Sequence, residues 1–213
     1  MPKQTFLSLP DEKREKIMRA GIHQFIRYGY EKGNVGEIAK AAGVAKGSMY
    51  QYFEDKKELF LYSVQWTMEL LLKKYAPMMI AQEEGSIFDF LEKNARDILF
   101  QMKEERELVI FIQDVFLGKY HTLTDESMEY VIKMSEEHMQ RMITVGKKNG
   151  SIRNDISDPI LKLYITGVSF KIKEYLMSKA RSEGEDIIDE DYGKIEKEVA
   201  EMMELLKNGM GGK

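Results

Sequence analysis

The sequence predicts an all-α protein of about nine helices, with a small N-terminal domain over residues 1–54 and a larger helical domain over residues 55–213. Three observations support this prediction. The chain has only 4 prolines, whereas Met, Glu, Lys and Leu, which favour helices, are frequent. Apolar residues recur at helical spacing, and no segment shows the alternation of a strand. Helix-start and helix-stop signals divide the chain at short intervals.

The N-terminal domain is expected to contain three helices. The first begins at Ser8 and ends near Gly29, and its apolar residues form one stripe. The second is short, with Asn34 as its N-cap and Gly43 at its end. The third begins near Lys46 and runs to the end of the domain. Two short helices in succession, joined by a tight turn, are typical of a helix-turn-helix.

The larger domain is expected to contain six helices. The first of them starts at Asp55, which has capping-box spacing to Glu58, and is ended or kinked by Pro77. Five more follow, and the second of these five is apolar enough to be buried on all sides. They are expected over residues 85–103, 107–118, 124–150, 157–180 and 189–209.

The composition excludes several classes of site. The chain has no cysteine, which removes disulfides, thiol nucleophiles and thiolate metal sites. The sequence contains no glycine-rich phosphate loop, no nucleophile signature and no histidine pair at ligand spacing. We therefore expect neither an enzyme nor a metal or cofactor site. No apolar run has the length of a signal sequence or a membrane span, which favours a cytoplasmic protein.

Charge is distributed unevenly along the chain. The net charge is −4, but residues 1–57 carry 11 Lys and Arg against 7 Asp and Glu, whereas the remaining residues carry 21 against 29. A cationic N-terminal domain on an acidic body favours a nucleic-acid partner for that domain. Chance scatter of charge is the alternative that the count leaves open.

The third expected helix is unusually polar. Met49 and Phe53, four residues apart, are placed to anchor it inward. The remaining side chains carry hydrogen-bond donors, acceptors and aromatic rings, which suit the wall and phosphates of a DNA major groove. The residues expected on the outer side are Lys46, Gly47, Ser48, Tyr50, Gln51 and Tyr52.

The stretch NVGEIAKAAGVAKGSMYQYFEDKKELF, residues 34–60, resembles the DNA-binding signature of the TetR family of transcriptional regulators. The resemblance extends over about residues 12–62. A second, weaker resemblance is to the start of that family's dimerisation helices. It lies in residues 149–170, NGSIRNDISDPILKLYITGVSF. The resemblance implies a homodimer that binds double-stranded operator DNA and a small-molecule effector. Repression is the family's common mode, and activation stays open.

The resemblance also implies roles for individual residues. Asn34 would cap the second helix near a phosphate, and Lys56 would contact a phosphate at the start of the fourth helix. Gln51 is the best candidate base reader, because glutamine can pair bidentately with adenine. Two positions depart from the family pattern: Ala45 stands where a serine often caps the recognition helix, and Gly36 cannot supply a base contact. The implied DNA-binding residues are Asn34, Lys46, Gly47, Ser48, Tyr50, Gln51, Tyr52 and Lys56.

By the same resemblance, the larger domain would hold the effector. Its large aromatic and methionine side chains could line an apolar pocket, although such residues at helical spacing are more often core. The candidate pocket residues are Trp66, Phe100, Met102, Phe116, Tyr120, Met142 and Tyr164.

The two C-terminal helices carry a candidate dimer interface. Apolar residues of the last helix step by three and four, as in the seam of helices that pack at a shallow angle. The preceding helix is apolar on more than one face and so needs two packing partners. The alternative is that both helices belong to the core of a single chain. The candidate interface residues are Ile160, Tyr164, Tyr192, Ile195, Val199, Met202 and Leu206.

Together these observations predict a DNA-binding transcriptional regulator, a repressor released from a near-palindromic operator by a small, largely apolar effector. The alternative function is a helical adaptor dimer whose N-terminal domain makes protein contacts. That alternative explains the larger domain but gives no reason for the polar third helix.

Overall fold

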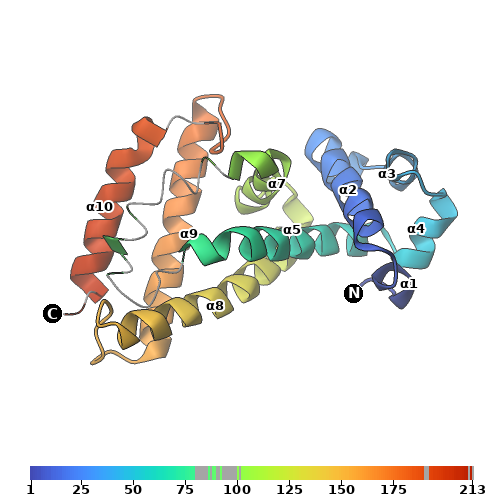
Figure 1. Cartoon of the computed structure of the whole chain (residues 1–213). Helices are drawn as coiled ribbons and strands as arrows, with labels where there is room; N and C mark the ends of the chain where they lie inside the picture. Colours follow the sequence, from blue (N-terminus) through green and yellow to red (C-terminus); the bar gives the residue numbers. More distant parts are fainter. Residues whose placement is uncertain are drawn as a thin grey trace. The chain divides into compact units, whose positions relative to one another are not determined.

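The computed structural model describes residues 1–79, 102–189 and 192–210, together with six isolated positions. The described residues form nine α-helices and two short 3-10 helices, with no β-sheet among them (Figure 1), which confirms the all-α prediction. The isolated positions are Ser86, Phe88, Asp89, Glu92, Phe100 and Gly212. The α-helices are α1 (Gln4–Leu7), α2 (Asp11–Lys32), α3 (Val35–Ala42), α4 (Lys46–Tyr52), α5 (Lys56–Met79), α7 (Arg106–Phe116), α8 (Thr124–Lys148), α9 (Asp158–Ser182) and α10 (Tyr192–Met210).

The helix boundaries follow the local signals in the sequence over most of the chain. The helix expected over residues 85–103 is the exception, because it lies almost entirely outside the described residues. Pro77 lies in the last turn of α5, which ends two residues later at Met79. No helix in the described part of the chain is both long and apolar enough to cross a membrane.

The start of the chain differs from the prediction. A short helix, α1, precedes the first expected helix, and the Ser8 hydroxyl donates to the carbonyl of Gln4 within this turn at 2.8 Å. As a result α2 begins only at Asp11, without a side-chain cap. Gly29 breaks α2 at a φ of 73°, but helical residues continue to Lys32. The predicted stop is therefore a kink, which a glycine tolerates because it has no Cβ.

By packing, the chain divides into two compact units. The first consists of residues 1–70 and 107–131, and the second of residues 71–106 and 132–213. The first unit therefore holds the whole expected N-terminal domain together with most of α7 and the starts of α5 and α8. The functional boundary expected after residue 54 stays a prediction.

Aromatic side chains form the centre of the first unit. The ring of Phe60 on α5 lies 5.0 Å from that of Phe25, 5.6 Å from that of Phe111 and 4.8 Å from that of Tyr120. All four side chains are buried. Such edge-to-face contacts stabilise beyond the burial of the rings alone. Helix α7 is buried on all sides over residues 108–115, as its composition predicts.

The second unit has its own apolar core, to which α8, α9 and α10 contribute. The side chains come from positions at helical spacing on each of these helices, so each presents one apolar stripe to the others. The core residues are Phe88, Met139, Met142, Ile143, Ile152, Leu161, Ile165 and Leu206.

Candidate nucleic-acid interface

Helices α3 and α4 and the turn between them form a helix-turn-helix. Asn34 caps α3 as predicted, since its Oδ1 accepts hydrogen bonds from the amides of Gly36 at 2.8 Å and Glu37 at 3.4 Å. Gly43 ends α3 at a φ of 71°, a left-handed conformation that favours glycine. The chain thereby turns sharply enough for α4 to start three residues later.

Helix α4 is anchored by its inward face. Met49 and Phe53 are both buried, which confirms the predicted anchors. Ala45 stands at the N-cap, and no side chain caps the helix there. A helix of only 7 residues is not stable by itself in water, so its position depends on the side chains packed around it.

The outer face of α4 is polar and exposed, with one exception. The side chain of Tyr50 is 48% exposed, and Gln51 beside it is exposed as well. Tyr52, which was expected on the outer side, is only 8% exposed because its ring packs edge-on against Phe6 of α1 at 5.9 Å. Its burial corrects that expectation and removes its ring from the accessible face. The other outward residues are Lys46 and Gly47, which are exposed, and Ser48, which is partly exposed.

Gly36 has a spatial role in this site. A Cβ at Gly36 would lie 3.1 Å from Oδ1 of Asn34 and 3.5 Å from Cδ of Lys46. The glycine therefore leaves room for the capping oxygen of Asn34, whereas its distance to the aliphatic stem of Lys46 is an ordinary contact. Asn34 and Lys46 both lie near Gly36 at the positive end of the α3 dipole, where an anion such as a DNA phosphate is favoured.

Lys56, at the start of α5, is held by the end of α2. Its Nζ donates to the carbonyl of Glu31 at 2.9 Å and lies 4.7 Å from the ring centroid of Tyr30. Burial and the nearby Asp55 carboxylate raise the pKa of Tyr30, so this tyrosine keeps its proton at neutral pH. The ammonium group of Lys56 thus sits at a fixed place on the first unit, next to the helix-turn-helix.

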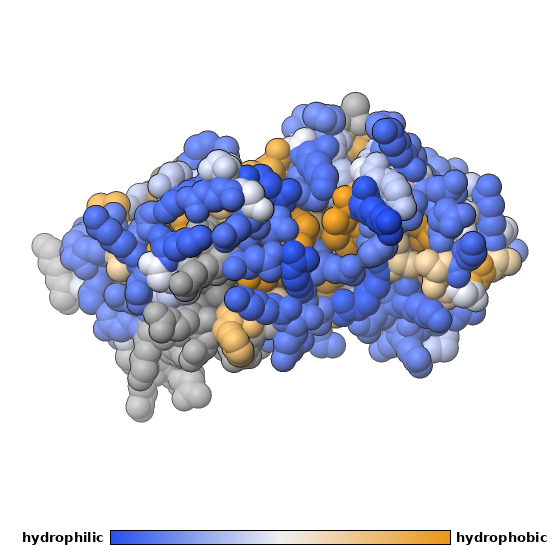
Figure 2. Space-filling model, turned by 90° about the horizontal axis from the view of Figure 1, so that it is seen from above, coloured by the Kyte–Doolittle hydropathy of each residue, from blue (hydrophilic) through white to orange (hydrophobic). Residues whose placement is uncertain are grey.

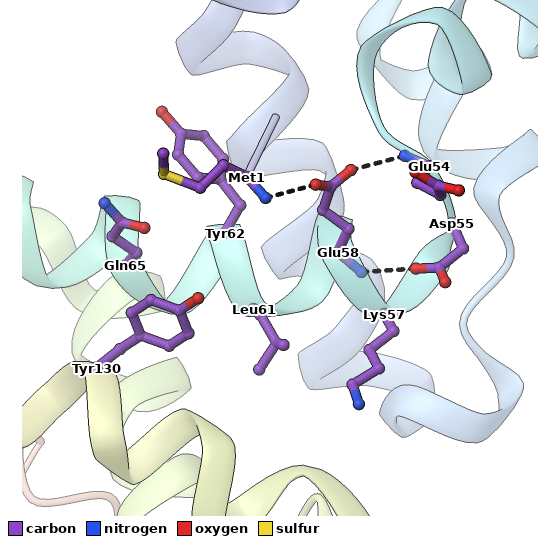
Figure 3. A pocket seen from close by; sticks show the side chains of 9 residues that line it. All are labelled: Met1, Glu54, Asp55, Lys57, Glu58, Leu61, Tyr62, Gln65 and Tyr130. Carbon is purple, nitrogen blue, oxygen red and sulfur yellow. Dashed lines mark hydrogen bonds and ion pairs between the residues drawn. The ribbon is translucent and has the colours of Figure 1, made fainter. Parts of the chain in front are cut away.

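The start of α5 has the predicted cap by Asp55, but the return bond of Glu58 goes to the residue before the cap and not to the cap itself (Figure 3). The carboxylate of Asp55 accepts the amide of Glu58 at 2.8 Å, and the carboxylate of Glu58 accepts the amide of Glu54 at 2.6 Å. A shallow groove of about 300 Å³ lies beside this turn. Its charged lining is mixed, because the carboxylates of Glu54, Asp55 and Glu58 lie with Lys57 and with the N-terminal amine, which pairs with Glu58 at 2.6 Å. The groove residues are Met1, Glu54, Asp55, Lys57, Glu58, Leu61, Tyr62, Gln65 and Tyr130.

The helix-turn-helix is matched by known regulators. Residues 17–62 match the family model of bacterial regulatory proteins of the tetR family. The HTH-type transcriptional activator FasR of Mycolicibacterium smegmatis is 28% identical over 149 residues, which cover 64% of this chain and 67% of FasR. Residues 17–62 therefore form a helix-turn-helix of the TetR type.

Two further comparisons extend the likeness beyond the DNA-binding helices. A probable acrEF/envCD operon repressor of Escherichia coli is 23% identical over 177 residues, 78% of this chain and 77% of the repressor. The crystal structure of the regulator FadR from Bacillus subtilis in complex with stearoyl-CoA has the same fold, with a TM-score of 0.64 and 17% identity over 89% of this chain and 96% of FadR. These relatives are transcriptional regulators, and this chain, with its TetR-type helix-turn-helix, is a DNA-binding regulator.

The candidate effector residues of this regulator are not gathered at one described cavity. Trp66 and Phe116 lie in the first unit and are partly buried, and Tyr120 is buried there. In the second unit, Phe100 is exposed and Met142 is buried. The two remaining candidates, Met102 and Tyr164, are partly buried and exposed, respectively. None of these seven residues lines the groove at the start of α5 or a second groove, which lies between α8 and α9. A pocket made by these residues therefore stays a prediction.

The candidate dimer residues divide between surface and core. Ile195, Val199 and Leu206 of α10 are buried within the single chain, and Met202 packs against the second apolar core. Tyr192 is partly buried. The regular seam of α10 therefore packs within this chain, which is the alternative that its periodicity left open. Two candidates, Ile160 and Tyr164, are exposed on α9.

An apolar face of α9 is exposed beyond those two residues. Leu163 is 71% exposed, and with Ile160 and Tyr164 it forms a stripe at helical spacing. A Cβ at Gly167, one turn further, would meet no atom within 4 Å, so another backbone could approach there. A groove of about 480 Å³ runs beside the stripe, between α8 and α9. The surface in view in Figure 2 is largely hydrophilic, with smaller apolar patches. An exposed apolar stripe such as that of α9 is a candidate site of association.

The start of α9 is fixed by charged groups. The carboxylate of Asp158 accepts hydrogen bonds from Nζ of Lys147 at 2.6 Å and from Nε2 of Gln140 at 3.0 Å. These two bonds lower the pKa of Asp158. Lys147 also donates to the carbonyl of Ile156 at 2.8 Å. The apolar stripe of α9 therefore begins at a defined position against α8.

His138 of α8 is a buried histidine of the second unit. Its side chain is buried, and its Nδ1 has no hydrogen-bond partner among the described residues. Burial, and then the positive charges of Arg141 and Lys173, lower its pKa. A lowered folded-state pKa contributes stability that is present above the unfolded pKa of about 6.5 and is lost as the pH falls below it.

We therefore expect the protein to lose more stability between pH 7.5 and pH 5.5 than a His138→Leu variant does. Urea denaturation followed by circular dichroism at both pH values measures this difference. His121→Asn serves as the control, because His121 is exposed and asparagine tolerates its φ of 39°. Equal losses for the wild type and the His138→Leu variant would show that His138 does not set the acid response.

No group of three or more histidine, aspartate or glutamate side chains in the described ranges is arranged to hold a metal ion.

Proposed function

We propose that this regulator is a repressor that binds a near-palindromic operator as a homodimer and is released by a small-molecule effector. The observation that carries the DNA-binding part is the exposed polar face of α4, which stands on the buried anchors Met49 and Phe53. In a helix-turn-helix, the second helix enters the major groove with its exposed side chains toward the base edges. A dimer places two such helices at the two half-sites of one operator.

The roles within each half-site follow from the chemistry of the side chains. Gln51 is proposed to read a base, because its amide can both donate and accept. Tyr50 and Lys46, which are also exposed, are proposed to hold phosphates on either side of it. Asn34 and Lys56 are proposed as backbone contacts at the edges of the site. The backbone at Gly47 and Ser48, in the first turn of α4, completes the set.

The homodimer is proposed to form through the exposed stripe of α9. Ile160, Leu163 and Tyr164 supply the apolar surface, and Gly167 supplies the close approach. A two-fold interface pairs the same patch on both protomers, so a single stripe suffices for both. The seam of α10 supports the stripe from inside the chain.

The effector is proposed to be a largely apolar molecule with an acyl chain. FadR of Bacillus subtilis, which shares the fold, was crystallised with stearoyl-CoA. The second unit of this chain contains methionines such as Met139 and Met142 in its core, and methionine adapts its shape to apolar ligands. An effector that binds better to a conformation unsuited to the operator would shift the population off DNA. Release of bound operator by long-chain acyl thioesters, against free coenzyme A as the control, tests this class.

Selection from randomised duplexes tests the proposed DNA binding. We expect a two-fold-symmetric consensus whose affinity falls steeply as salt increases, because phosphate contacts release counterions. No enrichment at low salt by protein that was unfolded, freed of ligand and refolded would contradict the proposal. In that case the helical adaptor would be favoured.

Replacing Gln51 by alanine is expected to change sequence preference more than total affinity. Loss of one good bidentate contact removes discrimination of about 1–3 kcal/mol at the base that it reads. Replacing Tyr50 by alanine is expected instead to weaken binding to all duplexes alike. Repeating the selection with each variant measures both effects, and Tyr28→Ala, at an exposed tyrosine of α2, serves as the control. An unchanged consensus for the Gln51→Ala variant would remove Gln51 from base reading.

A further inference from the structure

The segment of residues 3–8, which contains α1, is not used by the DNA contacts proposed above. It lies before residues 17–62, over which the chain matches the family model. α1 is a single helical turn of 4 residues, too short to be stable alone. It nevertheless runs against the C-terminal end of α4, the helix proposed to read DNA.

The carbonyl groups in the last turn of α4 need hydrogen-bond donors from outside the helix. The final four carbonyls of a helix have no amide partner within the helix. In α4 these are the carbonyls of residues 49–52. The amide of Phe53, which follows the helix, donates to the carbonyl of Met49 at 2.8 Å. Three carbonyls are left for groups outside the helix.

All three are bound by the segment of residues 3–8. Nζ of Lys3 donates to the carbonyl of Tyr50 at 2.9 Å. The backbone amide of Lys3 donates to the carbonyl of Tyr52 at 2.8 Å. The hydroxyl of Thr5 donates to the carbonyl of Gln51. The ammonium group of Lys3 also lies at the negative end of the helix dipole, where a cation is favoured.

Apolar contacts hold the same segment in place. Phe6 has no exposed surface, and its ring lies 4.8 Å from that of Phe53, 5.6 Å from that of Tyr62 and 5.9 Å from that of Tyr52. Two of these partners lie at the end of α4, and Tyr62 belongs to α5. Phe6 therefore joins α1 to the end of α4 and to α5.

We propose that residues 3–8 are a positioning element for the recognition helix, with Phe6 as its anchor and with Lys3 and Thr5 as the donors that cap α4. This inference rests on the proposed function, in which α4 reads the operator. Helix α4 has no side-chain cap at its start. The three carbonyls at its end are bound by residues 3–8. Gln51, the proposed base reader, belongs to that turn, and the direction of its side chain depends on the capped backbone.

Thr5 gives the sharpest test, because it is exposed and its replacement leaves the core intact. Thr5→Val keeps the shape of the side chain and removes the hydroxyl. Thr5→Ser keeps the hydroxyl and is expected to behave as the wild type. Gln4→Ala is the matched control, since the Gln4 side chain contacts Ser8 within α1. Lys3→Met is a second variant, which removes the ammonium donor and leaves the backbone amide in place.

Amide hydrogen exchange in the free full-length protein is the first measurement. We expect the amides at the end of α4 to exchange about threefold to tenfold faster in the Thr5→Val and Lys3→Met variants, from the net contribution of one hydrogen bond. Exchange in α2 and α7 is expected to stay unchanged. Wild-type exchange in α4 in both variants would overturn the proposal.

Affinity for the selected operator, compared with affinity for an unrelated duplex, is the second measurement. A positioning role predicts that the Thr5→Val variant loses about threefold to tenfold in operator affinity and nothing on the unrelated duplex, with Thr5→Ser restoring the wild-type value. An equal loss on both duplexes would overturn positioning. If the wild type selects no operator, the proposed DNA reading fails, whereas the exchange measurement still decides whether residues 3–8 hold α4.

Discussion

Replacing Leu163 by glutamate is expected to convert the protein from a dimer to a monomer. Leu163 is 71% exposed in the single chain and lies at the centre of the α9 stripe, so the substitution does not disturb the core of the protomer. In the proposed dimer, two-fold symmetry buries this position in both copies. An unpaired charge in an apolar interface costs several kcal/mol, and the cost applies twice.

The Leu163→Glu variant is expected to keep the fold of the protomer but to bind the operator much more weakly. Joining two heads converts binding of the second half-site into an intramolecular step, which raises overall affinity by about 10²–10⁴-fold. The Leu163→Glu variant is therefore expected to lose about 10² or more in operator affinity. Light scattering measures the mass of the variant in solution, and fluorescence anisotropy measures its operator affinity.

Leu205→Glu, at a 70% exposed leucine of α10 outside the α9 stripe, is the matched control and is expected to stay dimeric. A dimeric Leu163→Glu variant with wild-type operator affinity would show that the α9 stripe is not the interface. The seam of α10 is unsuited to the same test, because glutamate at the buried Val199 would destabilise the protomer itself.

Replacing Phe60 by alanine is expected to destabilise the protein by about 3–5 kcal/mol. Phe60 has no exposed surface and packs against Phe25, Phe111 and Tyr120 in the first unit. Alanine would remove all three edge-to-face contacts and leave a cavity between the remaining rings. The free energy of unfolding of a domain is about 5–15 kcal/mol, so this loss is a large fraction of it.

Urea denaturation followed by circular dichroism measures this loss. Tyr28→Ala, which removes a half-exposed ring from α2, is the control and is expected to change stability by no more than about 0.5 kcal/mol. Phe60→Leu is expected to recover much of the loss, because it leaves a smaller cavity. A change below about 1 kcal/mol for Phe60→Ala would mean that the aromatic cluster is not the centre of the first unit.

Local signals in the sequence predicted most of the helices and the DNA-binding motif. Asn34 and Asp55 act as helix caps as expected, and Gly43 ends α3. These devices act over three or four residues, so the chain specifies them without reference to distant segments. Met49 and Phe53 are predictable as anchors for the same reason, since their spacing defines one face of a helix.

Positions that depend on distant segments were not predictable in this way. Tyr52 was expected to face outward, but Phe6, 46 residues earlier in the chain, covers its ring. α1 itself was missed, because a single turn has no periodicity and Ser8 carries an apparent helix-start signal. Three residues at the start of the chain, Lys3, Thr5 and Phe6, bind or cover the end of α4, which no local pattern in the sequence connects to them.

The sequence alone determined that this protein is an all-α regulator with a helix-turn-helix. Helix caps, glycine stops and helical periodicity each depend on residues only a few positions apart, so short stretches of sequence specify them. Only the tertiary structure decided which apolar faces are covered. α10 carries the more regular seam, yet Ile195 and Val199 are buried within the chain, whereas Ile160 and Leu163 of α9 are exposed. Periodicity shows that a face needs a partner, but only the packing of the other helices shows which faces already have one.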